Sequence, residues 1–307
     1  MSKAETGRNN ESFYLKKVYK RKLGGSLEFT TARLSYQVSF LIALLMIWKT
    51  VAGGFEPYMI ALAAVFAVEF VLQYYIAGRI RKEVISSEEG ISDHTRKLGY
   101  LLLPFVVTGN FFIFIAGAML AKKEKNLEYQ LAIYSLLVTI FVILVSSLNL
   151  FKEWVVSTFW LGIGLYALYA VLNFVILLAV NKYTFGKKPD KKFMPFAVIC
   201  LLGICLGNVF AFMLGLITIG KYRNKNEEVS VEWIDVIKRL FRNYTAVIGM
   251  FLVVFFITIS IGSNLTFDYE SAISNNFMAR LAEPSLQYPF GCDDYGRCVF
   301  TRIVFGA

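Results

Sequence analysis

Long apolar runs separated by short polar stretches dominate the pattern of this chain. Each helical residue adds about 1.5 Å, so about 20 apolar residues are enough to cross a hydrocarbon core that is about 30 Å thick. The bilayer offers backbone groups no other partner, so each run is predicted to be helical. Runs of this length cover residues 36–54, 57–78, 98–121, 127–150, 154–180, 193–220 and 244–262. The pattern predicts an all-α integral membrane protein with about seven transmembrane helices.

Composition supports the membrane assignment. Hydrophobic residues make up 57% of the 307 residues and the mean hydropathy is +0.56, whereas a soluble domain is about 45–50% apolar. The net charge of +10 comes from Lys and Arg that lie mostly between apolar runs, where they orient helices toward the cytoplasm. The positive charge therefore indicates contact with a lipid bilayer and argues against nucleic acid as a partner.

The distribution of Lys and Arg predicts a cytoplasmic N-terminus in the cell membrane. Most of the 32 Lys and Arg residues then fall in cytoplasmic segments, beginning with the basic segment 1–35. Seven crossings would leave the tail after residue 262 on the outer side. Basic residues within 122–125 and 182–192 would also face outward, against the rule. A miscounted span is the alternative explanation for this exception.

A repeated motif indicates that the six-helix region 36–225 arose by duplication. Both copies contain a G-N-x-F-x-F-x-x-G motif, and three crossings per copy would place the second copy upside down, as in many transporters. Chance is the alternative, because a chain with 28 Phe matches itself easily at Phe. The matched features are the motifs at 109–117 and 207–215, the Pro-Phe pairs at Pro104 and Pro195, and the entry sequences at 34–37 and 127–130.

Glu69 is the acidic residue that lies deepest in a predicted span. A carboxylate in the hydrocarbon layer is costly and often functional, as a proton or ion site. The alternative is a protonated or hydrogen-bonded Glu that faces Asn110, Asn149, Asn173 or Asn208 across the bundle. Both interpretations stay open at this point.

No pattern in the sequence indicates an active site. There is no phosphate-binding loop, no nucleophile paired with a base and no metal-ligand spacing, and the single histidine, His94, lies in a charged loop without a second ligand nearby. We therefore expect no enzymatic activity, no cofactor and no metal centre in this chain.

The C-terminal part carries the most specific motif. A basic amphipathic run at 231–243 is predicted to lie on the cytoplasmic leaflet. It leads into the span through Arg242-Asn-Tyr-Thr-Ala-Val-Ile-Gly249, and the patterned segment 288–307 follows on the outer side. This order resembles the start of the C-type permease subunit of dipeptide, oligopeptide and nickel ABC importers. The positions that match the family pattern are Pro289, Gly291, Asp293, Gly296, Arg297, Val299, Arg302, Gly306 and Ala307.

Four positions depart from the family pattern. Tyr288 stands where His is usual, Cys292 replaces Thr, Cys298 replaces Asp, and Thr301 replaces Ser. The missing Asp puts its polar contact in doubt. Cys292 and Cys298 either form a disulfide on an oxidising outer side or stay free.

The motif residues are expected to form a structural elbow before the next span. Gly291 and Gly296 permit turns and close backbone approach. We expect Asp293 to cap a helix that starts near Tyr295. Arg297 and Arg302 would lie on that helix and reach the outer headgroups. Direct contact with the solute is the less favoured alternative.

The resemblance implies an importer for peptides or a similar solute such as nickel, with alternating access driven by ATP hydrolysis in partner subunits. It implies a second permease subunit, two ATPase subunits and an extracytoplasmic solute-binding protein. Residues 226–307 would be the start of the permease domain, so we expect the chain to be a truncated piece of one. The six-helix region has two alternative interpretations. It is either a membrane sensor or scaffold, or an independent secondary transporter that uses Glu69. The sequence does not indicate the solute.

Overall fold

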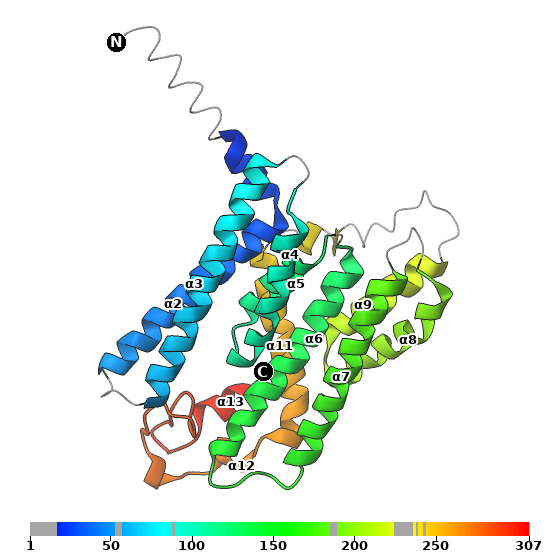
Figure 1. The fold of residues 1–307 in the computed structure, drawn as a ribbon. Helices are drawn as coiled ribbons and strands as arrows, with labels where there is room; N and C mark the ends of the chain where they lie inside the picture. Colours follow the sequence, from blue (N-terminus) through cyan, green and yellow to red (C-terminus); the bar gives the residue numbers. More distant parts are fainter. Residues whose placement is uncertain are drawn as a thin grey trace, which may run out of the picture. The chain divides into compact units, whose positions relative to one another are not determined.

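The computed structural model describes residues 17–52, 57–87, 90–123, 125–184, 189–223, 236–237, 239–241 and 244–306. Helices joined by loops account for the secondary structure of these residues, with one isolated antiparallel bridge. The all-α membrane class is therefore confirmed. The chain divides into two compact units, residues 1–125 and 126–307, which we describe separately. Figure 1 shows the helices in chain order.

Unit 1 consists of two long helices followed by a chain of shorter ones. The long helices α2 (Leu27–Ala52) and α3 (Pro57–Ser86) are both apolar and long enough to cross a membrane. They pack against each other through aromatic side chains, including Tyr36 and Tyr74, whose ring centroids lie 5.6 Å apart. The shorter elements are α4 (Asp93–Leu102), the 3-10 helix η1 (Leu103–Thr108) and α5 (Phe111–Ala121).

The short helices of unit 1 form a hairpin, so the prediction of one continuous span at 98–121 is wrong. The chain reverses at Gly109, whose φ of 81° is left-handed and favours glycine. The two arms then approach closely, because a Cβ on Gly99 would lie 2.5 Å from the carbonyl oxygen of Gly117. Arg96 donates hydrogen bonds to the carbonyl oxygens of Leu120 and Lys122 near the open end of the hairpin. The start of α4 and the end of α5 therefore lie side by side at the open end of the hairpin.

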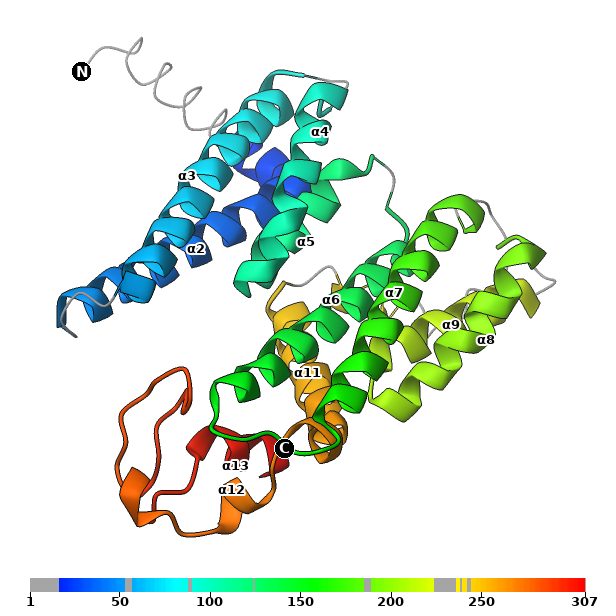
Figure 2. The ribbon, with the colours of Figure 1, turned by 60° about the horizontal axis from the view of Figure 1, so that its bottom comes forward.

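Unit 2 begins with the same order of elements (Figure 2). The long helices are α6 (Leu127–Ser147) and α7 (Phe159–Tyr183), and η2 (Leu148–Phe151) ends the first of them. The hairpin consists of η3 (Lys191–Phe193), α8 (Met194–Leu202), η4 (Gly203–Leu206) and α9 (Val209–Arg223). It reverses at Gly207, with φ 75°. A Cβ on Gly215 would lie 2.6 Å from the carbonyl oxygen of Ala197, so the predicted span 193–220 is also a hairpin.

The shared order of elements supports the duplication and corrects its details. Gly109-Asn110 and Gly207-Asn208 both form hairpin tips with a buried Asn. In contrast, Pro104 lies in η1 close to the tip, while Pro195 lies in the first turn of α8, so these prolines are not equivalent. Inversion of the second copy required three crossings per copy, and each copy has two helices long enough to cross. Two crossings per copy would not invert the second copy, so the inverted repeat stays a prediction.

The permease-like segment starts with α11 (Tyr244–Thr266), a fifth helix long enough to cross a membrane among the described residues. It packs on α6 and α7 within unit 2. Tyr166 donates a hydrogen bond of 3.1 Å to the carbonyl oxygen of Thr258, and Asn149 donates one of 2.9 Å to that of Thr266. A Cβ on Gly262 would lie 2.5 Å from the Tyr166 hydroxyl. The second copy and α11 thus form one compact body, and a domain boundary at residue 225 stays a prediction.

The predicted interfacial helix at 231–243 lies largely outside the described residues. Phe241 is described and is buried. Its ring centroid lies 5.5 Å from that of Tyr134 on α6 and 6.4 Å from that of Phe210 on α9. This end of the run is therefore fixed to the second hairpin.

Candidate functional site: the elbow after the last span

The chain turns sharply after α11 and builds a compact elbow, which we define as residues 267–306. Its helical elements are α12 (Glu270–Ile273), the 3-10 helix η5 (Phe277–Ala279) and α13 (Val299–Gly306). Asp268 starts the turn, because its carboxylate accepts hydrogen bonds from the backbone N–H groups of Glu270 (3.1 Å) and Ser271 (2.8 Å). These bonds satisfy free donors at the start of α12. Figure 2 shows the elbow as the orange and red loops around α12 and α13.

Two glycines, Gly291 and Gly296, form the turns of a tight hairpin between η5 and α13. Cys292 and Cys298 face each other in an antiparallel bridge, flanked by backbone hydrogen bonds from Asp293 N–H to the Arg297 carbonyl and from Val299 N–H to the Gly291 carbonyl. Gly291 and Gly296 have φ angles of 72° and 74°. Both positions therefore favour glycine, as the sequence predicted.

Asp293 is the polar centre of the hairpin. Its carboxylate accepts hydrogen bonds from the N–H groups of Tyr295 and Arg297, from Arg297 Nε at 2.8 Å and from Arg302 Nη1 at 2.6 Å. Partial burial opposes ionisation of this carboxyl, but the hydrogen bonds and the charge of Arg297 outweigh it and lower the pKa of Asp293 from 3.8 to about 2. Asp293 therefore stays ionised and fixes both arginines.

Two details of the predicted elbow need correction. The helix begins at Val299 and not near Tyr295, so Asp293 caps a turn and only Arg302 is helical. The guanidinium groups of Arg297 and Arg302 bind Asp293, because a carboxylate within reach binds them more specifically than headgroups would. Pro289 is half-buried and Gly306 is exposed at the end of α13. Glu69 lies in unit 1 and is no part of this site.

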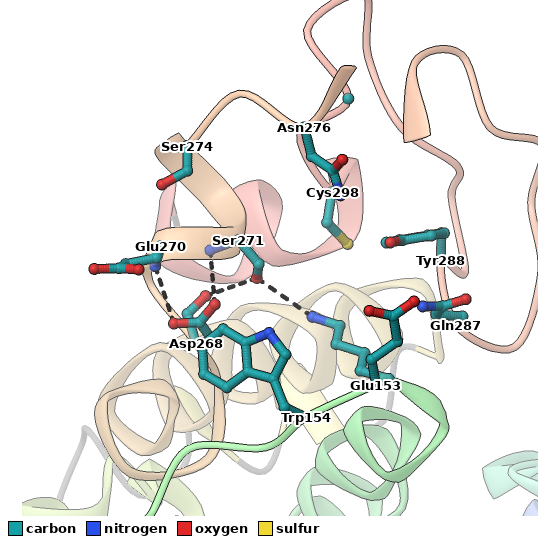
Figure 3. Close-up of a pocket in the computed structure, with 12 residues that line it drawn as sticks. Glu153, Trp154, Asp268, Glu270, Ser271, Ser274, Asn276, Gln287, Tyr288 and Cys298 are labelled. Carbon is teal, nitrogen blue, oxygen red and sulfur yellow. Dashed lines mark hydrogen bonds between the residues drawn. The ribbon is translucent and has the colours of Figure 1, made fainter. Parts of the chain in front are cut away.

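A polar pocket of about 200 Å³ opens beside the hairpin (Figure 3). Lys152, from the loop after η2, reaches into it and donates to Thr301 Oγ1 (2.9 Å) and Ser271 Oγ (3.5 Å). Burial lowers the pKa of Lys152, and the neighbouring Cys298 and Asp268 offset part of this effect. The lining residues are Lys152, Glu153, Trp154, Asp268, Glu270, Ser271, Ser274, Asn276, Gln287, Tyr288, Gly296 and Cys298.

Sequence reasoning missed Lys152, although one signal pointed to it. It is the single Lys or Arg between the predicted spans 127–150 and 154–180. In the structure it links the loop after η2 to Thr301 of the elbow. Within the described residues, no group of three His, Cys, Asp or Glu could hold a metal ion. The pocket thus offers hydrogen-bonding and charged groups, and the contacts of Lys152 hold the loop after η2 against the elbow.

Comparisons with known proteins identify the part of the chain that contains this elbow. Residues 232–284 match the family model of the N-terminal TM domain of oligopeptide transport permease C. The dipeptide transport system permease protein DppC of Alkalihalophilus pseudofirmus is 40% identical over 75 residues. That match covers 24% of this chain and 24% of the relative. No solved structure matches. The segment from residue 232 is therefore similar to the N-terminal membrane segment of C-type permeases of dipeptide and oligopeptide ABC importers, and the chain spans about a quarter of the length of the relative it matches.

Proposed function

We propose that this chain is a membrane subunit of an ABC importer for dipeptides, oligopeptides or a similar solute such as nickel. The match of α11 and its flanks to the permease family carries the proposal. The partners would be a second permease subunit, two ATPase subunits and an extracytoplasmic solute-binding protein. ATP hydrolysis in the ATPase subunits would drive alternating access. The elbow would then fix the angle at which the chain leaves α11.

The second copy of the repeat would serve as a scaffold for the first permease helix. Thr258 of α11 donates to the Gly207 carbonyl oxygen at the tip of the second hairpin (3.1 Å), and a Cβ on Gly162 would lie 2.7 Å from the Thr266 side chain. Close backbone approach through small residues is how transmembrane helices associate. These contacts favour a scaffold over an independent sensor for residues 126–223.

A topology with five crossings would remove the exception to the positive-inside rule. Arms of 11 and 15 residues in α5 and α9 are too short to cross a core of about 30 Å, so each hairpin would enter and leave on one side. With a cytoplasmic N-terminus, segments 122–125 and 182–192 then become cytoplasmic. Of the 32 Lys and Arg residues, all except Lys49, Lys152, Arg280, Arg297 and Arg302 lie on that side.

Transport and topology can be tested separately. The complete gene, expressed with its neighbouring ATPase subunits, should co-purify with them and support ATP-dependent uptake of a labelled dipeptide into vesicles. Absence of both association and uptake would refute the importer proposal. For topology, Lys123→Cys and Arg280→Cys are introduced singly into a chain whose four cysteines are replaced by serine. An impermeant maleimide should label only Arg280→Cys in intact cells, and labelling of Lys123→Cys would refute the topology.

A further inference from the structure

Glu69 is fully buried in the middle of α3, where it meets the tip of the first hairpin. Its Oε1 lies 2.6 Å from Thr108 Oγ1 of η1, and its Oε2 lies 2.7 Å from Asn110 Nδ2. The same Nδ2 donates to Ser39 Oγ of α2 at 2.8 Å. The groups that face Glu69 from the elements packed around it are thus Ser39, Thr108 and Asn110, and none of them is charged or titrates.

The hydrogen-bonding capacity of Thr108 is compatible with a proton on Glu69. Thr108 Oγ1 lies 2.6 Å from Glu69 Oε1 and 2.7 Å from the carbonyl oxygen of Phe105. A hydroxyl has one hydrogen, and the Phe105 carbonyl has none to give. Thr108 donates to Glu69 when that carboxyl is ionised and shares its one hydrogen with the Phe105 carbonyl; a proton on Glu69 would let Glu69 donate to Thr108 and leave the Thr108 hydrogen for Phe105.

Glu128, the other buried acidic residue in the described part of the chain, has a cationic partner, and so does the half-buried Glu28. Glu28 lies 2.6 Å from Lys125 Nζ, and Glu128 lies 2.5 Å from Lys221 Nζ. An ionised carboxylate without such a partner is very costly in an apolar interior. Burial without a cationic partner therefore favours the protonated form of Glu69.

The repeat shows that the fold does not require a carboxyl group here. Ser39 and Asn110 of the first copy correspond to Thr139 and Asn208 of the second, where Asn208 Nδ2 donates to Thr139 Oγ1 at 3.2 Å. The hydrogen bonds of Ser35 with Gln73 and of Ser135 with Asn173 support an offset of 100 between the copies, which replaces the match of 34–37 with 127–130 and places Tyr169 at the position of Glu69. The polar tip thus folds in the second copy without an acid.

We propose that Glu69 is a proton-binding site whose protonation holds the first hairpin tip in place. Loss of the proton would leave an unpaired charge among uncharged groups, and the tip would have to rearrange to solvate it. Asn110 Oδ1 of the tip and Gln73 Oε1 of the adjoining α3 are buried and have no hydrogen-bond partner among the described residues, so polar atoms near Glu69 are available for a second arrangement. This role is independent of the proposed importer function.

Dicyclohexylcarbodiimide tests the proposal on the full chain in lipid vesicles. A protonated carboxyl adds to the carbodiimide: its proton moves to one nitrogen, and its oxygen bonds to the central carbon. Migration of the acyl group to nitrogen then gives a stable N-acylurea, with no leaving group and no change of oxidation state. Peptide mass spectrometry should find this adduct on Glu69 and not on Glu28 or Glu128, which form ion pairs with Lys125 and Lys221.

The pH dependence and two controls decide the outcome. Labelling of Glu69 should fall about tenfold per pH unit above its titration midpoint, and Glu69→Gln should remove the adduct while the thermal transition of the chain is retained. Labelling of Glu69 no faster than that of Glu28 would overturn the proposal. Protection by sodium at constant pH would also overturn it, because the site would then hold a metal cation. Neither readout requires transport, so failure here leaves the importer proposal unaffected.

Discussion

Gly296→Ala should open the elbow hairpin. A Cβ at this position would lie 1.6 Å from the carbonyl oxygen of Asn276 and 2.5 Å from its carbonyl carbon. Both atoms belong to the backbone, so no side-chain rotation relieves the overlap. The neighbouring Tyr295 carbonyl accepts a 2.9 Å hydrogen bond from Asn276 N–H, and separation of the two segments would break that bond as well.

The cost can be worked from three contributions. A left-handed φ costs an L-residue about 1 kcal/mol, overpacking a tight site costs about 1–3 kcal/mol, and a lost backbone hydrogen bond costs about 1 kcal/mol. The three contributions overlap, because a shift that relieves the steric clash is also what breaks the hydrogen bond. We therefore expect Gly296→Ala to destabilise the closed hairpin by roughly 3 kcal/mol. Since about 1.4 kcal/mol corresponds to a factor of ten, the open population should rise by roughly a hundredfold.

Thiol alkylation measures that opening directly. Cys292 and Cys298 are 8% and 1% exposed in the closed hairpin, so a maleimide reaches them mainly when it opens. Under reducing conditions, both should be alkylated roughly a hundredfold faster in Gly296→Ala. Gly306→Ala is the matched control, because nothing lies within 4 Å of a Cβ there. Equal alkylation rates in the two variants would refute the reasoning.

Three further results are expected from the same region. The pKa of Asp293 is lowered from 3.8 to about 2, so the ionised carboxylate stabilises the hairpin fully above pH 3.8 and loses this effect as the pH falls through 2. The rate at which pepsin cleaves the hairpin should rise over that range in the unmodified chain, and it should not change with pH in this way in Asp293→Asn. Cys292 and Cys298 form a bridge pair with no hydrogen bond between them, and the Cα atoms of such a pair lie about 4.5 Å apart, which is within disulfide range. Oxidised glutathione should therefore convert both thiols to one disulfide by exchange, measured by mass spectrometry. A persistent glutathione adduct on either cysteine would contradict this prediction. Tyr166→Phe removes the hydrogen bond to the Thr258 carbonyl and should lower the stability of unit 2 by about 0.6 kcal/mol, measured by thermal unfolding in detergent; an unchanged transition would show that the bond contributes nothing.

The sequence was sufficient to locate the long helices and insufficient to locate the hairpins. Hydropathy responds to length and apolar content, and α2, α3, α6, α7 and α11 satisfy both. The segments 98–121 and 193–220 satisfy them too, because glycine is common in transmembrane helices and does not mark a reversal there. The signal that could have revealed the hairpins was charge, since segments 122–125 and 182–192 broke the positive-inside rule.

The elbow shows a similar division between what a motif fixes and what it leaves open. Glycines at 291 and 296 were predicted to permit turns, and their left-handed φ angles agree. The role of Asp293 was misplaced, because an aspartate before free N–H groups looks the same in a sequence whether a turn or a helix follows. Lys152 is far from the elbow in sequence, and only the tertiary fold brings it to Thr301.

The two copies of the repeat have diverged in the groups at their tips, and this divergence suggests a division of roles. In the second copy a Cβ on Gly207 would lie 2.9 Å from Thr258 Cα, so the tip backbone is a packing surface for α11, and Tyr169 occupies the position of the acid. In the first copy nothing lies within 4 Å of a Cβ on Gly109, and the tip instead surrounds Glu69. A surface that packs a permanent helix gains from rigidity, whereas a proton site requires a tip that can rearrange. Within the described residues of unit 1, the open space beside a Cβ on Gly109 is what the proton-binding proposal requires.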